Sequence, residues 1–387
     1  MSEPGIGAVG EPELRVALDV SAVPARPAGA GVYVIELARA LATSGAVDLT
    51  LLSGRGDVDR WRTAAPSAAL RPTVPPGRPL RLAWEQVWAP AAARRARAHV
   101  WHGPHYTMPM RSTVPAVVTI HDMTFFDHPE WHERTKVGFF RRMIMASARR
   151  AAVLVCVSEH TSRRLHDVVS PPGPVVVAPH GVDHDRFRPE AAGGPDDDLA
   201  RLRAAGVRPP YLVFVGTLEP RKNVPALVRA FDRVASAHGD LTLVLAGQPG
   251  WGADEIDAAV AACRHGDRVL RLGYVPAPTV PALLRHAAAA VYPAFEEGFG
   301  LPALEALACG APLVTTSGSA MEEVTAGAAV LVPPGDEPAL TDALAAVAGD
   351  AALRTRLRAA GPPIAAPYTW ERCASLHVDA YRRAAAT

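Results

Sequence analysis

Residues 296–305 read EEGFGLPALE and carry the most specific pattern in the chain. The string follows an apolar run at 289–292 and opens an Ala- and Leu-rich stretch that closes at Gly310. Pro302 suits the first turn of a helix, and Gly310 suits the position just beyond its last turn. The pattern therefore predicts a strand, a glycine turn and a helix, which is the repeating unit of a parallel sheet.

The two glycines of this string predict a site for an anion. Gly298 and Gly300 allow the backbone to turn tightly and allow a ligand to approach it. Free N–H groups at the start of the following helix, with the positive end of its dipole behind them, favour a phosphate. Glu297 and Glu305 lie near that position, where carboxylates suit sugar or ribose hydroxyls. The alternative is a glycine-rich loop with two solvated glutamates, which so long a string makes less favourable.

A second strand, turn and helix start lie at residues 211–223. The apolar run YLVFV at 211–215 is followed by Gly216 and then by the adjacent cations Arg221 and Lys222. Arginine grips phosphate oxygens with a fork of N–H groups, whereas lysine acts as a point charge. The alternative is an unrelated pair of surface cations, but their position after a strand-end glycine favours phosphate binding.

Two weaker motifs follow strands of the N-terminal half. The Gly29-Ala30-Gly31 turn lacks the third glycine of a dinucleotide fingerprint, so a simple tight turn is an equal alternative. His121 and Asp122 come directly after the apolar run at 116–120. Residues at the carboxyl ends of strands line the ligand crevice of an open α/β sheet, so His121 is a candidate hydrogen-bonding group. A structural histidine is the alternative.

Short apolar runs alternate with stretches of helical spacing along the whole chain. This alternation predicts an α/β fold of parallel βαβ units, with strands covered on both faces. It is broken once, at 186–210, by a segment rich in Pro, Gly and Asp. We therefore expect an N-terminal Rossmann-like domain, a linker, a C-terminal Rossmann-like domain and a last amphipathic helix, at 1–190, 191–210, 211–367 and 368–387.

The composition excludes several classes of protein. Of the 387 residues, 49% are hydrophobic and 20% are charged, which is ordinary for a globular chain and wrong for a disordered one. The net charge of +1 provides no field that would gather nucleic acid. The four cysteines are far apart, so no metal or redox pair is expected. Neither a signal peptide nor a membrane-spanning run is visible, which predicts a soluble cytoplasmic protein.

Two other features have a plain interpretation beside a functional one. The D-x-D pairs at 57–59 and 183–185 could hold a divalent metal on a diphosphate, but they lack acidic neighbours and are interpreted as loop residues. Trp84, Trp88 and the arginines of Arg94–Arg97 indicate a basic amphipathic helix. Core packing with a solvated basic face is favoured there over peripheral contact with the inner face of a membrane.

Together these motifs resemble those of the retaining, GT-B-fold glycosyltransferases of the family-4 type. The resemblance covers nearly the whole chain and is carried chiefly by the E-x7-E spacing from Glu297 to Glu305. It implies two Rossmann-like domains that face each other across a cleft, with a C-terminal helix returning to the first domain. The supporting strings are the glycine turn at 29–31, TIHD at 119–122, P-x-G-V-D at 179–183, G-T-L-x-x-x-K-N at 216–223 and LGYV at 272–275.

The resemblance also implies roles for residues in binding a nucleotide-diphosphate sugar. Arg221 and Lys222 would neutralise the diphosphate, and Glu297 would hold hydroxyls of the transferred sugar. Glu305 would hold the ribose hydroxyls, and His121 would face the sugar from the opposite wall. The remaining donor contacts would come from the glycine turns, the helix start and the strand end near the base: Gly31, Gly216, Tyr274, Val275, Gly298, Phe299, Gly300 and Leu301.

The implied reaction moves a hexose, with mannose favoured, to a hydroxyl of a glycan, a lipid-linked acceptor or a natural product. Two fixed cations and a helix start would stabilise the leaving diphosphate, so no metal or other cofactor is expected. The alternatives are a nucleotide-sugar epimerase or a phosphorylase on the same fold, and a non-catalytic nucleotide-sugar binding module. A phosphorylase normally brings a cofactor lysine, and the chain has only Lys136 and Lys222.

Overall fold

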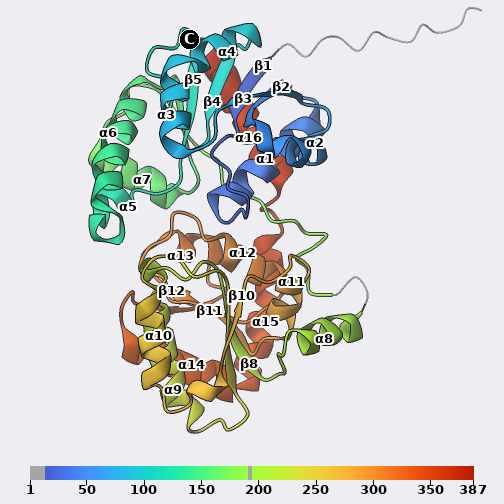
Figure 1. Cartoon of the computed structure of the whole chain (residues 1–387). Helices are drawn as coiled ribbons and strands as arrows, with labels where there is room; N and C mark the ends of the chain where they lie inside the picture. Colours follow the sequence, from blue (N-terminus) through green and yellow to red (C-terminus); the bar gives the residue numbers. More distant parts are fainter. Residues whose placement is uncertain (1–13, 191–193) are drawn as a thin grey trace, which may run out of the picture.

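The computed structural model describes residues 14–190 and 194–387 and folds them into two α/β domains, drawn one above the other in Figure 1. Each domain is built on one parallel sheet with helices packed against it. Along the first strand, Val16 and Leu18 belong to one hydrophobic core and Ala17 to another. Because side chains alternate between the faces of a strand, both faces of this sheet are covered, as its continuous apolar runs predict.

Within residues 14–190, the first sheet has seven parallel strands in the order β3-β2-β1-β4-β5-β6-β7. Strand β1 pairs with β2 on one side and with β4 on the other, so the strand order reverses between β1 and β4. Ligands of doubly wound sheets bind at the carboxyl ends of the strands near such a reversal. The strands span Arg15–Asp19, Asp48–Gly54, Ala69–Val74, Val100–Gly103, Ala116–Ile120, Val153–Cys156 and Val175–Val177, numbered β1 to β7.

Within residues 194–387, the second sheet has six parallel strands in the order β10-β9-β8-β11-β12-β13. Strand β8 pairs with β9 and with β11, which repeats the reversal of the first sheet. The strands span Tyr211–Val215, Thr242–Ala246, Val269–Gly273, Ala289–Tyr292, Leu313–Thr316 and Val330–Val332, numbered β8 to β13. The two sheets confirm the predicted pair of Rossmann-like units.

The helices fill the connections between these strands, and none within the described ranges is both long and apolar enough to cross a membrane. Those of the first domain are α1 Ala30–Ser44, α2 Val58–Ala64, α3 Arg78–Val87, α4 Ala89–Arg95, α5 Thr124–Asp127, α6 Arg134–Arg150 and α7 Glu159–Val168. Those that follow are α8 Pro195–Ala204, α9 Val224–Ala235, α10 Ala253–Ala262, α11 Thr279–His286, α12 Leu301–Ala308, α13 Ala320–Thr325, α14 Glu337–Gly349, α15 Ala351–Ala365 and α16 Trp370–Ala385. Short 3₁₀ turns are η1 Arg55–Asp57, η2 Pro129–Trp131, η3 Pro220–Lys222 and η4 Gly266–Arg268.

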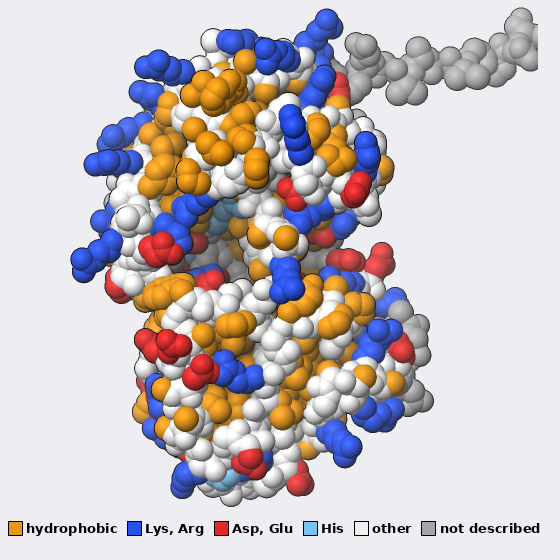
Figure 2. Space-filling model, viewed as in Figure 1, with side chains coloured by type: hydrophobic (Ala, Val, Ile, Leu, Met, Phe, Trp, Pro, Cys, Tyr) orange, Lys and Arg blue, Asp and Glu red, His pale blue; other side chains and the backbone are white. Residues whose placement is uncertain are grey.

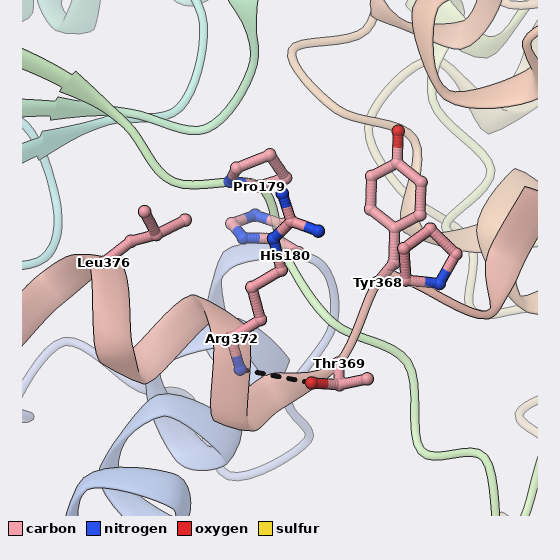
Figure 3. Close-up of a pocket in the computed structure, with 7 residues that line it drawn as sticks. Pro179, His180, Tyr368, Thr369, Arg372 and Leu376 are labelled. Atoms are coloured by element: carbon pink, nitrogen blue, oxygen red, sulfur yellow. Dashed lines mark hydrogen bonds between the residues drawn. The ribbon is translucent and has the colours of Figure 1, made fainter.

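The last helix, α16, leaves the second domain and packs on α1 and β6 of the first (Figure 1). Thr369 caps it by accepting a hydrogen bond from the Arg372 N–H group at 3.1 Å. Figure 3 shows a pocket of about 200 Å³ at this crossing, where the chain between the domains meets the start of α16. The return of α16 confirms the arrangement that the resemblance implies.

A chain of buried hydrogen bonds joins α16 to the first domain. His377 Nδ1 lies 2.8 Å from the Cys373 carbonyl, which can only accept, so this nitrogen carries a proton. His377 Nε2 therefore accepts from the Tyr33 hydroxyl at 2.8 Å. That hydroxyl in turn accepts from Thr119 at 2.9 Å. Each step fixes the direction of the next.

The same chain continues to the end of α16 and requires neutral histidines. His102 Nε2 donates to Thr119 at 2.8 Å, which leaves His102 Nδ1 to accept from the Tyr381 hydroxyl at 2.8 Å. Protonating either His102 or His377 would turn an acceptor into a donor and break the chain. Burial acts in the same direction, because it lowers the pKa of His102 well below its usual value and that of His377 to about 4.

The segment between the sheets differs from the expected linker. Within 191–210, residues Pro195–Ala204 form α8, which packs against α11 of the second domain. Asp198 is buried and holds Arg285 at 2.6 Å and 2.8 Å through two hydrogen bonds. The Pro, Gly and Asp content that indicated a linker thus also starts a helix, because proline and acidic residues suit a first turn.

We predict that acid weakens the fold through the two histidines of this buried chain. Unfolded histidine has a pKa near 6.5, so below about pH 6.5 the unfolded state binds more protons than the folded state. Stability is then full above about pH 6.5 and decreases toward pH 4, by about 2 kcal/mol per histidine at pH 5. Urea unfolding at pH 7.5, 6.0 and 5.0 is compared between the unchanged chain and a His102→Gln/His377→Gln variant, because the raised pKa values of the buried Glu85 and Glu305 act in the opposite direction in both chains. The variant should lose less stability toward pH 5.0, and the same pH dependence in both chains would contradict the prediction.

Candidate active site

The residues singled out by sequence gather where strand ends of the two domains face each other. Figure 2 shows the hollow between the domains on this side of the molecule. From the second domain, the segment at 216–223 follows β8 and the segment at 293–300 follows β11. From the first domain, His121 follows β5. Neighbouring parallel strands carry these segments to one edge of each sheet.

Glu297 joins the two motifs of the second domain. Its carboxylate contacts Lys222 Nζ through one oxygen and Arg221 Nη1 through the other, the latter at 3.0 Å. The side chains of Lys222 and Glu297 are only 12% and 11% exposed, so the pair is largely removed from water. Arg221 also donates to the Glu296 carbonyl at 3.2 Å, and its own carbonyl accepts from the Phe295 N–H group at 2.9 Å. The cation pair and the glycine loop therefore lie together in the second domain.

The glycine loop leads directly into α12. Gly300 has a φ of 93°, and a Cβ atom there would lie 2.2 Å from the Met321 sulfur, so neither conformation nor space admits a side chain. Within the described residues, the N–H groups of Phe299, Gly300 and Leu301 have no hydrogen-bond acceptor. With the dipole of α12 behind them, these groups can receive an anion.

Gly298 brings the loop onto the first domain. A Cβ atom on Gly298 would lie 1.7 Å from the His121 carbonyl oxygen, so the two backbones touch. The Gly298 carbonyl accepts from Ser158 Oγ at 2.6 Å and from Thr161 Oγ1 at 3.1 Å. Both hydroxyls are buried at the start of α7. The loop is thereby held by the first domain as well as by its own.

Two further contacts between the domains involve residues that the sequence did not single out. The Glu323 carboxylate of α13 accepts from the N–H groups of Glu159 and His160 at 3.0 Å and 2.9 Å. It thus caps the first turn of α7 from the opposite domain. His160 Nε2 also lies 2.7 Å from Glu296. Ser158 is recognisable as a cap from its place after a strand, but its partners across the cleft are not.

His121 lies buried at the end of β5 with one ring nitrogen free. Its Nε2 donates to the Pro104 carbonyl at 2.7 Å, so Nδ1 is the acceptor, and it has no partner among the described residues. Burial lowers the pKa of His121, against the smaller opposing effects of the Pro104 carbonyl and Asp122. The ring is therefore neutral at pH 7 and can accept a hydrogen bond from a ligand.

The predicted contacts to the nucleoside lie farther along the same edge. Glu305 lies about one turn into α12. Burial raises its pKa to about 7, although the charge of Arg186 acts to lower it. Tyr274 follows β10 and is 57% exposed, with the Arg26 guanidinium of the first domain 5.6 Å from its ring centre. Val275 is half-buried against the core beside it. Arg26 is a contact that sequence motifs did not indicate.

The other predicted positions have more local explanations. The Gly31 N–H group donates to the Ala28 carbonyl at 2.9 Å, so in this conformation it does not serve a phosphate. Gly216 directly follows β8, and its N–H group donates to the Ala246 carbonyl at 2.9 Å, which places it at the edge of the sheet near η3. The Asp183 carboxylate accepts hydrogen bonds from the N–H groups of Asp185 and Arg186 at 3.1 Å and 3.2 Å, so it stabilises its own turn. In the described ranges no cluster of three metal-ligating side chains occurs.

The expected basic amphipathic helix is two helices, α3 and α4, which meet at Trp88. Trp84 is buried in the core, as the favoured interpretation requires. Trp88, between the two helices, is 56% exposed, and Leu80 and Val87 of α3 are exposed as well. Core packing therefore explains only part of the apolar pattern. Contact of this surface with a membrane remains the untested alternative.

The fold and this site define a glycosyltransferase of the GT-B class. The chain matches the family description Glycosyltransferase Family 4 over residues 27–186 and Glycosyl transferases group 1 over residues 209–350. A D-inositol 3-phosphate glycosyltransferase of Geodermatophilus obscurus is 30% identical over 400 residues, which cover 92% of this chain and 85% of that protein. The chain therefore belongs to glycosyltransferase family 4.

Other relatives agree with this assignment. O-antigen chain mannosyltransferase B of Escherichia coli is 29% identical over 305 residues, which cover 79% of this chain and 77% of that protein. Among solved structures, the sucrose-phosphate synthase from Thermosynechococcus elongatus has a TM-score of 0.75 at 21% identity and covers 95% of this chain and 98% of its own. That likeness confirms the two-domain fold.

We predict that Gly298→Ala disrupts the contact between the domains. Its methyl group would overlap the His121 carbonyl, and a backbone atom cannot turn away as a flexible side chain can. Overpacking of this kind costs about 1–3 kcal/mol, which lowers the melting temperature by several degrees if the domains stay in contact. If the domains separate instead, the radius of gyration increases. Scanning calorimetry measures the first outcome and small-angle X-ray scattering the second.

Gly239→Ala is the matched control, because no atom lies within 4 Å of a Cβ there and its φ is ordinary. We expect it to behave as the unchanged chain. If Gly298→Ala leaves both the melting temperature and the radius of gyration unaltered, the close contact at this position is refuted.

Proposed function

We propose that this glycosyltransferase is a retaining enzyme that moves a hexose, with mannose favoured, from a nucleotide-diphosphate sugar to a hydroxyl acceptor. The proposal rests on one observation above all. Arg221, Lys222 and the free N–H groups at the start of α12 are collected around Glu297, at the edge that faces His121. Cations and a helix start combined in a water-poor place suit a diphosphate that leaves with negative charge.

Electrostatic stabilisation of the leaving group is the main catalytic contribution in this proposal. When the bond between the anomeric carbon and the diphosphate breaks, positive charge builds on the sugar and negative charge on the phosphate. Arg221 and Lys222 are already held in place by Glu297, so little reorganisation is needed when the charge develops. The chain itself supplies the cations, and the proposal requires no metal.

Glu297 changes partners when the donor binds. In the structure described, its two oxygens are occupied by Lys222 and Arg221. A bound diphosphate competes for these cations, which releases acceptor capacity on the carboxylate for hydroxyls of the sugar. His121 Nδ1 offers a second neutral acceptor from the opposite wall. Glu297 is accordingly a positioning and charge-stabilising group and not a covalent nucleophile.

The transfer step balances without a further base. The acceptor oxygen forms a bond to the anomeric carbon on the face that the diphosphate leaves, while the carbon–oxygen bond to phosphate breaks. The acceptor proton passes to the departing phosphate oxygen. Configuration at the anomeric carbon is retained because both events occur on one face. Glu305 and the strand end at Tyr274 would hold the ribose and the base, and the mannosyltransferase among the relatives supports mannose.

We predict that Arg221→Gln with Lys222→Gln weakens nucleoside diphosphate binding at least 100-fold. Hydrogen bonds to a charged group are worth about 1.5–3 kcal/mol each, and two are removed. Titration calorimetry with GDP, UDP, ADP and dTDP identifies the preferred base in the unchanged chain and then measures the loss in the variant.

Arg229→Gln with Arg233→Gln is the matched control. These arginines lie on α9, pair with Glu337 and are about half exposed, so the charge change is the same but far from the site. The control should bind the nucleotide as the unchanged chain does. Equal affinities of the Arg221/Lys222 variant and the unchanged chain would refute the assignment of these cations.

A further inference from the structure

The first domain contains a cavity of about 820 Å³ that the donor site does not use. Four segments build it, each at or just after the carboxyl end of a strand: residues 21–24 at β1, 54–57 at β2, 74–78 at β3 and 105–107 at β4. The cavity thus lies on the same edge of the sheet as His121, at the reversal of the strand order. Its volume is large enough for a ligand of several rings.

Three arginines line this cavity: Arg55, Arg78 and Arg81. In the described part of the chain, none of the three has a carboxylate oxygen within 4.0 Å. Arg78 lies over the Phe140 ring at 5.3 Å, which orients its guanidinium. The neighbouring Arg60, by contrast, is paired with Asp57 at 3.6 Å. The cavity is therefore rich in uncommitted positive charge.

The acidic groups near the cavity are already engaged. Asp57 is the acidic residue of the lining and is paired with Arg60. Two buried carboxyls contact residues of the lining: Asp19 accepts from the Ser21 hydroxyl at 2.6 Å, and Glu85 accepts from the Thr107 hydroxyl at 2.7 Å. Burial raises the pKa of both carboxyls, that of Glu85 to about 7, so they only partly offset the charge of Arg81 above them.

The cavity adjoins the donor site through aromatic side chains. Tyr106 and His105 belong to its lining, and their rings lie 5.6 Å and 5.5 Å from the ring of His121. The His121 carbonyl touches Gly298 of the glycine loop. A ligand that fills the cavity therefore has one end among the arginines and the other beside the place where the donor sugar is proposed to lie.

We propose that this cavity binds an acceptor that carries a phosphate group, held by Arg78 and Arg81 with Arg55 at the rim. Arginine forks match phosphate oxygens with paired, charge-assisted hydrogen bonds, which an uncharged sugar cannot offer to these guanidinium groups. The acceptor's reactive hydroxyl extends past Tyr106 toward His121. This inference rests on the proposed transfer reaction and names the chemical class of its acceptor.

The test uses inorganic pyrophosphate as the probe and the full chain. We expect calorimetry to show pyrophosphate binding that persists when the preferred nucleoside diphosphate saturates the donor site. Arg78→Gln with Arg81→Gln should weaken that binding at least tenfold and leave nucleoside diphosphate affinity unchanged. Arg55→Gln, on the exposed rim, should weaken it less, and it keeps the test usable if the double variant does not fold.

Arg94→Gln with Arg95→Gln is the control, because these exposed arginines of α4 lie outside the cavity lining. Glucuronate at equal ionic strength separates a phosphate site from a general carboxylate site and should bind at least tenfold more weakly. The inference is overturned if nucleotide abolishes all pyrophosphate binding, if the control loses as much affinity, or if glucuronate binds equally well. If no nucleoside diphosphate binds the unchanged chain, the proposed function is overturned. Pyrophosphate binding that depends on Arg78 and Arg81 would still show a phosphate site in this cavity.

Discussion

Contact between the backbones of Gly298 and His121 is the constraint on which the site depends. Only a residue without a side chain can bring the loop after β11 against the end of β5, because any Cβ would overlap the His121 carbonyl. Ser158 and Thr161 then hold the Gly298 carbonyl from below. The glycine thus joins two domains at the point where their strand ends meet, and it places Glu297 opposite His121.

The charges around Glu297 follow from this enclosure. A carboxylate that is largely removed from water requires partners, and Arg221 and Lys222 provide one for each oxygen. Removing Glu297 would leave the largely buried Lys222 without its carboxylate, and a buried charge that loses its partner is costly. In the proposed function the same fixed cations stabilise the leaving diphosphate, so the interaction that holds the site together would also prepare it for its ligand.

The sequence predicted the parts of this site that are local. Residues 289–305 contain their own strand, turn and helix start, and residues 211–223 likewise, so each element follows from neighbouring residues. Two edge strands were harder to predict. Strand β3 alternates between exposed and half-buried residues and contains Pro72, which only an edge strand tolerates, and β13 has three residues.

Contacts between distant segments had no pattern that could indicate them. Glu323 caps α7 from 163 and 164 residues away, and Arg26 reaches Tyr274 across the domain boundary. Such pairs depend on the placement of whole domains and not on spacing along the chain. The arginines of the first-domain cavity are of the same kind, since four separate loops bring its lining together.

A crystal structure with the preferred nucleoside diphosphate is the most direct measurement of the central claim. The account predicts the diphosphate between the two domains, with its oxygens about 2.7–3.2 Å from Arg221, Lys222 and the N–H groups of Phe299, Gly300 and Leu301. The ribose should then lie at Glu305. A nucleotide bound elsewhere, with Glu297 still holding both cations, would contradict it.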